Sequence, residues 1–80
     1  MPQFSLETFL PEAAEILRVP VDQLTLESDD SNVSSWDSLS AVMLAMMVES
    51  NYGVALSSAQ TEQFTSVRKI VDIMTGFEKA

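Results

Sequence analysis

The sequence predicts an all-α fold, a four-helix bundle with a long loop between helices one and two and a short third helix. Three segments carry apolar residues at three- and four-residue spacing, which is the period of an amphipathic helix. These segments cover residues 4–18, 38–52 and 67–75. No segment shows the sustained alternation of apolar and polar residues that indicates a half-buried strand. We therefore expect an antiparallel-type bundle without a sheet.

The composition predicts one small domain over residues 1–80. Hydrophobic residues make up 46% of the chain, which is enough for a globular fold. We expect no membrane span, because no apolar run is long enough, and no secretory signal, because no basic segment precedes an apolar stretch. The chain has no cysteine, which excludes disulfides and is consistent with a cytoplasmic location.

The charge of the chain excludes several function classes. Lys and Arg number 4 against 12 Asp and Glu, for a net charge of −8. Nucleic-acid binding needs basic residues that replace phosphate counterions, so we exclude it, whereas an acidic surface favours basic protein partners. The chain has no histidine, so a Ser-His-Asp catalytic set cannot form and the commonest metal ligand is missing. We expect no catalytic residues and no metal site.

The first helix is expected within residues 4–18. It should end before Pro20, because the residue that precedes a proline avoids helical geometry. Its start is open. If the helix begins at Ser5, Pro11 removes a backbone hydrogen bond and should bend it. If Thr8 is the N-cap, Pro11 lies in the first turn and costs little.

Residues 19–36 form a connection of a length that is uncommon in compact domains unless the loop serves a function. Residues 21–24 can make a single helical turn. A polar, acidic block follows, and it invites comparison with an EF-hand calcium loop, which requires Gly at its sixth position and a carboxylate at its twelfth. Counted from Asp30, these positions hold Ser35 and Ala41, so we reject a calcium site.

The second helix, residues 38–52, is the element around which the chain is organised. Asp37 is a favourable N-cap, because its carboxylate can accept a hydrogen bond from a free N–H group of the first turn. Ser38 then falls at the first helical position, and Gly53 suits a left-handed helix end. The helix dipole and the free N–H groups would stabilise a phosphate ester on the Ser38 hydroxyl.

This second helix is apolar over most of its circumference. Its inward face is expected to hold Ala41, Leu44, Ala45, Val48 and Tyr52. A small domain rarely buries a helix all round, so some of its methionines should reach solvent or a partner. We expect Met43 and Met47 to face outward and Met46 to belong to the core.

Two further helices complete the chain. Ser57 and Gln60 match a capping box, which predicts a short third helix. The final helix carries a buried stripe that reaches Met74, and Gly76 is expected to follow its end. Residues 77–80 are then a tail, of which only Phe77 could pack.

The tripeptide Asp37-Ser38-Leu39 lies near the middle of the chain and opens an apolar helix, and it resembles the signature of the acyl carrier protein family. The order of helices and the long loop are similar to that family over roughly residues 4–75. The resemblance implies a 4′-phosphopantetheine arm, donated by coenzyme A, on Ser38, with Asp37 and Leu39 completing the attachment motif. The terminal thiol of that arm holds an acyl group as a thioester. The family does not catalyse, so we expect no enzyme.

The resemblance also implies the partners. They are a holo-acyl-carrier-protein synthase or another phosphopantetheinyl transferase, and the acyl-transferring and acyl-modifying enzymes of fatty-acid, polyketide or related acyl biosynthesis. We expect a monomer. The alternative is a small helical adaptor without a prosthetic group, whose methionine-rich helix would meet a partner groove.

Trp36 departs from the family pattern, which usually has Gly before the Asp-Ser-Leu motif. We expect the Trp36 side chain to anchor the long loop to the core. The alternative is that this bulky aromatic packs under the arm or covers the loop.

The exposed face of the second helix departs as well. That face is commonly acidic in the family, whereas Glu49 is the only acid within residues 38–52. We therefore hypothesise that Met43 and Met47 contact partner enzymes. The acids that steer their approach, on this hypothesis, come before the second helix: Glu27, Asp29, Asp30 and Asp37.

Overall fold

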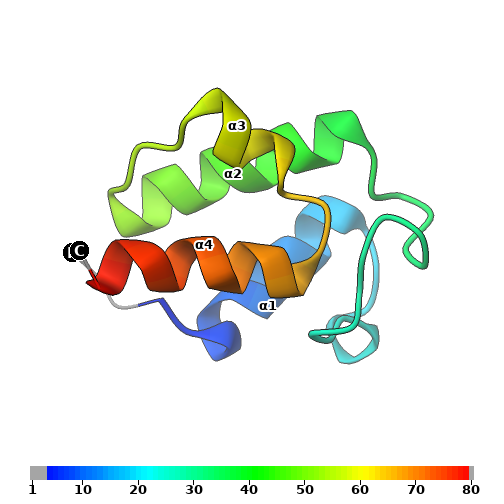
Figure 1. Ribbon diagram of the computed structural model, residues 1–80. Coiled ribbons are helices and arrows are strands. Elements are labelled where there is room, and N and C mark those ends of the chain that lie inside the picture. The colour runs from blue at the N-terminus through cyan, green and yellow to red at the C-terminus, as the bar shows by residue number, and fades with distance from the viewer. Residues whose placement is uncertain (1–3, 80) are drawn as a thin grey trace.

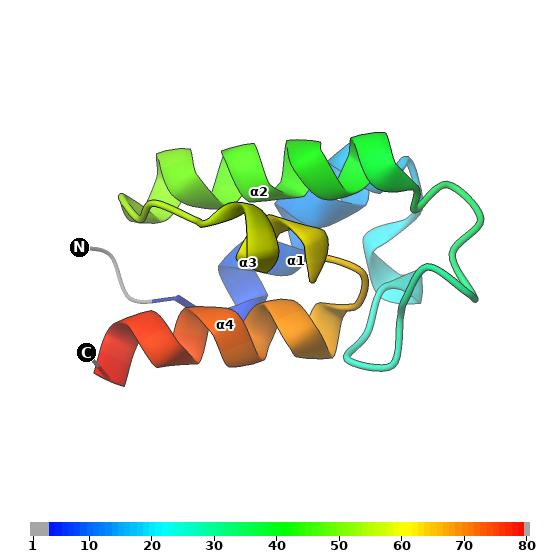
Figure 2. The ribbon, with the colours of Figure 1, turned by 45° about the horizontal axis from the view of Figure 1, so that its top comes forward.

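The computed structural model of the protein describes residues 4–79 and confirms the all-α fold, since its described part contains no strand. The elements are α1 (Leu6–Leu17), the 3-10 helix η1 (Val21–Gln23), α2 (Ser38–Tyr52), α3 (Ser58–Glu62) and α4 (Val67–Lys79). Helices α2 and α4 begin at the same end of the molecule, beside the long loop, and run in the same direction (Figures 1 and 2). Helix α1 runs the opposite way. No helix in the described residues is long and apolar enough to cross a bilayer.

The start of α1 resolves the open alternative in favour of Ser5. The Ser5 side chain caps the helix by accepting a hydrogen bond from the backbone N–H of Thr8, at 3.3 Å. Pro11 therefore lies inside the helix, where it is exposed to solvent. The helix ends at Leu17 because Arg18 adopts a left-handed conformation with φ 58°.

The long loop is tied to the beginning of α4 by two backbone hydrogen bonds. Asp30 donates its N–H to the carbonyl of Thr65 at 2.9 Å, and Val67 donates to the carbonyl of Ser28 at 3.0 Å. Asp29 and Ser66 form an isolated β-bridge between these two contacts. The loop that leads to α2 is thus held against the start of the last helix.

The core lies between α1, α2 and α4. The predicted inward face of α2 is confirmed, with Ala41 half-buried and the other four residues buried. They pack with buried side chains of the other elements: Phe9, Leu17, Phe64, Val67, Ile70 and Met74. These contacts fix which face of α2 points inward, and so they fix where its first turn presents Ser38.

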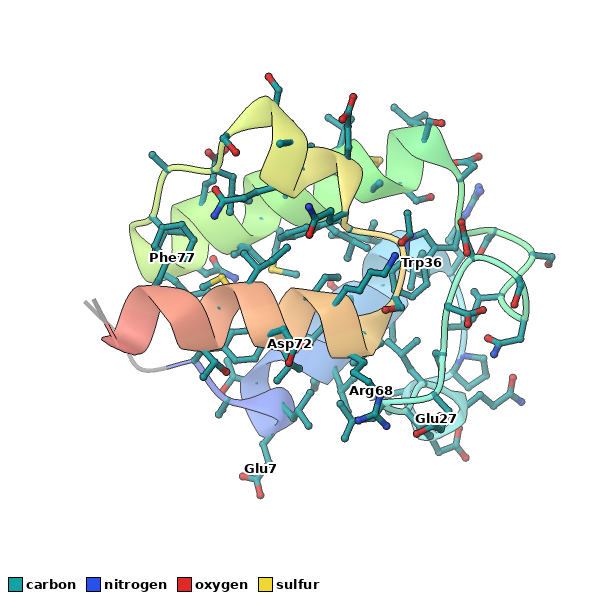
Figure 3. All side chains as sticks on the ribbon, viewed as in Figure 1. Glu7, Glu27, Trp36, Arg68, Asp72 and Phe77 are labelled. Atoms are coloured by element: carbon teal, nitrogen blue, oxygen red, sulfur yellow. The ribbon has the colours of Figure 1, made fainter. Side chains whose placement is uncertain are left out.

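Helix α3 has the predicted capping box, formed by the Ser57 and Gln60 side chains. The predicted end of α4 is wrong. The helix continues through Gly76 to Lys79, so residues 77–79 are helical and not a tail, and Ala80 lies outside the described residues. The reason is packing: Phe77 lies three residues after buried Met74, points inward from α4 and packs partly buried against the core (Figure 3).

Candidate functional site

The first turn of α2 is built as the sequence predicts. Asp37 has extended backbone geometry, and its carboxylate accepts a hydrogen bond from the Ser40 N–H at 2.9 Å. Ser38 is the first helical residue, and it is exposed. The hydrogen bonds from Ser40 and Leu39 hold the pKa of the Asp37 carboxyl below its usual range. A negative charge at this position is stabilised further by the helix dipole.

The residues on either side of Ser38 are fixed by tertiary contacts. Trp36 is only 4% exposed, and its indole Nε1–H donates to the carbonyl of Phe64 at 2.9 Å. Ser40 is buried, and its hydroxyl donates to the carbonyl of Ser35 at 2.8 Å. The expectation that Trp36 anchors the loop to the core is therefore confirmed. Ser38 is exposed and lies two positions from an anchored residue on each side, so its position is set although its own side chain is exposed.

A cavity of about 530 Å³ opens beside Ser38. Its walls come from the loop, the first turns of α2, and the segment from α3 to α4: Asp30, Trp36, Asp37, Ser38, Ala41, Val42, Thr61, Glu62 and Thr65. Thr61, Glu62 and Thr65 are residues that the sequence analysis missed. They lie more than twenty positions from Ser38 and join it only through the fold, so no local pattern points to them.

The three loop acids differ in their surroundings. Glu27 forms an ion pair with Arg68 of α4, and the two side chains point toward one another in Figure 3. Asp29 accepts hydrogen bonds from the Ser31 hydroxyl and from the N–H groups of Ser31 and Asn32, which lower the pKa of its carboxyl. Asp30 is exposed and lines the cavity beside Ser38. Of the three, Asp30 thus lies nearest to the candidate site.

Two methionines of α2 lie elsewhere than predicted. Met43 is exposed as predicted, but Met46 is not in the core: it is 62% exposed. Met47 does not face outward, because it is half-buried and packs against the core. At about 100° per residue, Met46 lies about 20° from Leu39, on the side opposite the buried face, whereas Met47 is turned about 80° toward the core.

Four exposed apolar residues of this face form one stripe at three- and four-residue spacing. The outer stripe, as we call it, consists of Leu39 (68% exposed), Val42 (45%), Met43 (43%) and Met46 (62%). Such a pattern normally marks the buried face of a helix. Polar residues border it, with Asp30 and Glu62 across the cavity beside Ser38, and Glu15 and Arg18 in a second cavity near Leu39. An exposed apolar patch with a polar rim is typical of an interaction site.

Glu49, the one acid of α2, does not belong to the outer stripe. Its carboxylate accepts a hydrogen bond from the N–H of Leu56 at 2.8 Å, which ties α2 to the segment before α3. The exposed face next to Ser38 therefore carries no acidic side chain of α2.

Comparison with known proteins decides the family. The family model described as "Phosphopantetheine attachment site" matches residues 7–74. The chain belongs to the acyl carrier protein family. It is 36% identical over 72 residues to an acyl carrier protein of Coprothermobacter proteolyticus, and the match covers 85% of this chain and 88% of the relative.

As a member of this family, the chain is a carrier and not an enzyme, and its attachment domain takes a covalently attached 4′-phosphopantetheine group. The adaptor alternative, which lacked a prosthetic group, is thereby set aside. The described residues fit the group: Ser38 offers an exposed hydroxyl at a helix start, and a cavity opens beside it. When attached, the arm supplies a terminal thiol that forms an acyl thioester.

Replacement of Asp37 tests the cap at this site. Asp37→Ala should lower the Tm by a few degrees, because the Ser40 N–H loses its acceptor. It should also slow attachment of the arm. Asp37→Asn is the matched control, since asparagine caps a helix equally well without the charge and should keep most of the Tm.

The charge itself should appear in the pH dependence of stability. The folded pKa of Asp37 lies below its ordinary value of 3.8. Its contribution is therefore complete above about pH 5 and is lost as the pH falls below 3.8 toward the folded pKa. Wild type should lose more stability than Asp37→Asn over this range when thermal unfolding is followed by circular dichroism. Equal Tm values for wild type and Asp37→Ala at pH 7 would remove the capping role.

Proposed function

We propose that Ser38 is the residue that carries the phosphopantetheine arm, with Asp37 and Leu39 completing the attachment motif. The observation that carries this proposal is the exposed Ser38 hydroxyl at the first position of α2, between anchored Trp36 and anchored Ser40. Its N-terminal position on the helix favours the negative charge of a phosphodiester.

Several side chains of the protein hold the Ser38 hydroxyl in place and line the cavity beside it. The Asp37 cap fixes the start of α2, and the Trp36 and Ser40 hydrogen bonds hold the backbone on both sides of Ser38. Val42 and the Trp36 indole give the adjoining cavity an apolar wall, while Thr61 and Thr65 offer hydroxyl groups. An arm on Ser38 would therefore start from a fixed point, beside a mixed surface that would suit its amide and methyl groups.

We propose further that the 80 residues form a single carrier domain that acts as a monomer in the cytoplasm. Its partners are a phosphopantetheinyl transferase and the enzymes of fatty-acid, polyketide or related acyl biosynthesis. The experiment that tests the function is intact-mass measurement after incubation with coenzyme A and a broad-specificity transferase. A gain of one phosphopantetheine supports the proposal, and an unchanged mass contradicts it.

Partner enzymes dock, on this proposal, on the outer stripe. Any enzyme that acts on the arm must approach Ser38, and Leu39 and Val42 are its exposed neighbours on the helix. Because the stripe is uncharged, the matching enzyme surface is an apolar patch, bordered by basic groups that face Asp30 and Glu62. Of the contact residues predicted from the sequence, Met43 and Asp30 fit this surface best. Glu27, Asp29 and Met47 contribute less, because each is engaged within the protein.

Substitutions at Met43 and at its neighbour Leu44 distinguish an effect on docking from an effect on stability. Met43→Ala should raise the dissociation rate of a partner enzyme, since most interface changes act on dissociation. It should cost little stability, because Met43 is exposed. Leu44→Ala, the matched variant, removes a fully buried side chain and should cost about 2–5 kcal/mol. Binding kinetics and urea unfolding measure the two effects. A Met43→Ala protein that is strongly destabilised yet docks normally would contradict this assignment.

A further inference from the structure

Two of the four outer-stripe residues are methionines whose side chains reach solvent. Met43 and Met46 lie three residues apart on one face of α2, within about two turns of Ser38. The other methionines in the described residues are less exposed, since Met74 is 1% exposed and Met47 is half-buried against the core. The chain has no cysteine, so Met43 and Met46 are its most exposed sulfur-containing residues within that part of the chain.

We propose that Met43 and Met46 form a redox-sensitive modification site that controls docking at the outer stripe. The inference rests on the proposed function of that stripe. The reactant is hydrogen peroxide: the thioether sulfur takes one of its oxygen atoms and becomes a sulfoxide. The O–O bond breaks, and the remaining oxygen leaves as water with both hydrogens of the peroxide. Sulfur loses two electrons, and the peroxide gains them.

The effect follows from the chemistry of the sulfoxide. It turns a flexible apolar side chain into a polar one with a strong hydrogen-bond acceptor. In free carrier this acceptor bonds to water, because both side chains are exposed. In a docked complex it faces an apolar patch and stays unpaired. An unpaired buried polar group weakens binding by about tenfold in the dissociation constant for each sulfoxide.

The fold is expected to survive this modification. Neither Met43 nor Met46 is part of the buried core, and the core sulfur of Met74 is shielded. The hydrogen bonds that fix the first turn of α2 involve Asp37, Ser40 and Trp36, which peroxide leaves intact under mild conditions. Oxidation should therefore change how the carrier is recognised and not whether it is folded.

The experiment uses the apo protein, which has no thiol. It is treated with dilute hydrogen peroxide, catalase removes the excess, and peptide mass mapping assigns the added oxygen. Met43 and Met46 should oxidise before Met47 and Met74. The KM for a phosphopantetheinyl transferase should then rise about tenfold or more with little change in kcat, and circular dichroism should stay helical. Treatment with methionine sulfoxide reductases should restore the KM.

Two variants, each compared with its own untreated sample, make the test specific. The double variant Met43→Leu, Met46→Leu has no oxidisable sulfur on the stripe, so peroxide should leave its KM where it started. Met47→Leu keeps both stripe methionines and should remain sensitive. An unchanged KM in oxidised wild type, or a sensitive double variant, overturns the inference. Failure of the untreated protein to accept the arm would instead contradict the proposed function.

Discussion

Ser38→Ala should abolish attachment of phosphopantetheine while leaving the protein folded. Attachment forms a bond between the serine oxygen and the phosphorus donated by coenzyme A, and alanine has no oxygen to form it. Ser38 is exposed, and the cap of α2 runs from the Ser40 N–H to the Asp37 carboxylate, so the helix keeps its first turn. Intact mass after incubation with coenzyme A and a transferase gives an all-or-none readout.

Ser34 provides the matched control for this experiment. It is also an exposed serine near the end of the loop, but it precedes the helix and lacks the Asp-Ser-Leu context. Ser34→Ala should gain the arm as wild type does. Ser40 is no competing site, because its hydroxyl is buried and donates to the Ser35 carbonyl. A Ser38→Ala protein that still gains the arm would refute the assignment of Ser38.

Trp36→Ala is expected to have the largest effect on stability of any loop substitution. It removes a buried aromatic side chain, which usually costs about 3–5 kcal/mol, and it deletes the hydrogen bond to the Phe64 carbonyl. A small domain has roughly 5–15 kcal/mol of stability in total. The variant should therefore lose a large fraction of its stability and unfold at a much lower urea concentration than wild type. Urea unfolding should be followed by circular dichroism, because Trp36 is the only tryptophan and its fluorescence disappears with it.

Two milder variants divide that loss into its parts. Trp36→Phe keeps most of the buried apolar volume but leaves the Phe64 carbonyl without its donor, at about 1–3 kcal/mol. Val21→Ala removes an exposed apolar side chain from the same connection and should change stability by less than about 0.5 kcal/mol. If Trp36→Ala were as stable as Val21→Ala, the loop would not depend on the indole.

The features that sequence alone predicted are those that local chemistry determines. Helix α2 begins after Asp37 and ends before Gly53, as predicted, because a cap and a left-handed helix end depend only on neighbouring residues. The capping box of α3 is equally local. The choice between Ser5 and Thr8 as the first cap could not be made locally, since both are good caps and Pro11 allows either start with a different cost.

The features that sequence missed depend on contacts between distant segments. Phe77 is the tail residue that the sequence allows to pack, but the sequence does not reveal that this contact with the core continues α4 past Gly76. The sequence predicts Met46 as buried and Met47 as exposed, the reverse of the structure. The reason is that α2 is apolar nearly all round, so its periodicity leaves the rotation of the helix open. The carbonyl that accepts the Trp36 hydrogen bond and the position of Glu62 beside Ser38 come only from the fold.

Because α2 is apolar nearly all round, other contacts must also fix its rotation about its own axis when the protein folds. A half-turn about its axis would exchange the outer stripe for the face of Leu44 and Val48, and both faces are apolar enough to be buried. Shape separates the two settings: the inner face carries Ala41 and Ala45, which allow close approach of the helices. The buried Ser40 hydroxyl distinguishes the two rotations as well, because only the native one lets it donate a hydrogen bond to the Ser35 carbonyl. The exposed apolar face that suits partners thus makes a second packing of α2, rotated by half a turn, nearly as favourable. Two alanines and one serine hydroxyl select the native packing over it.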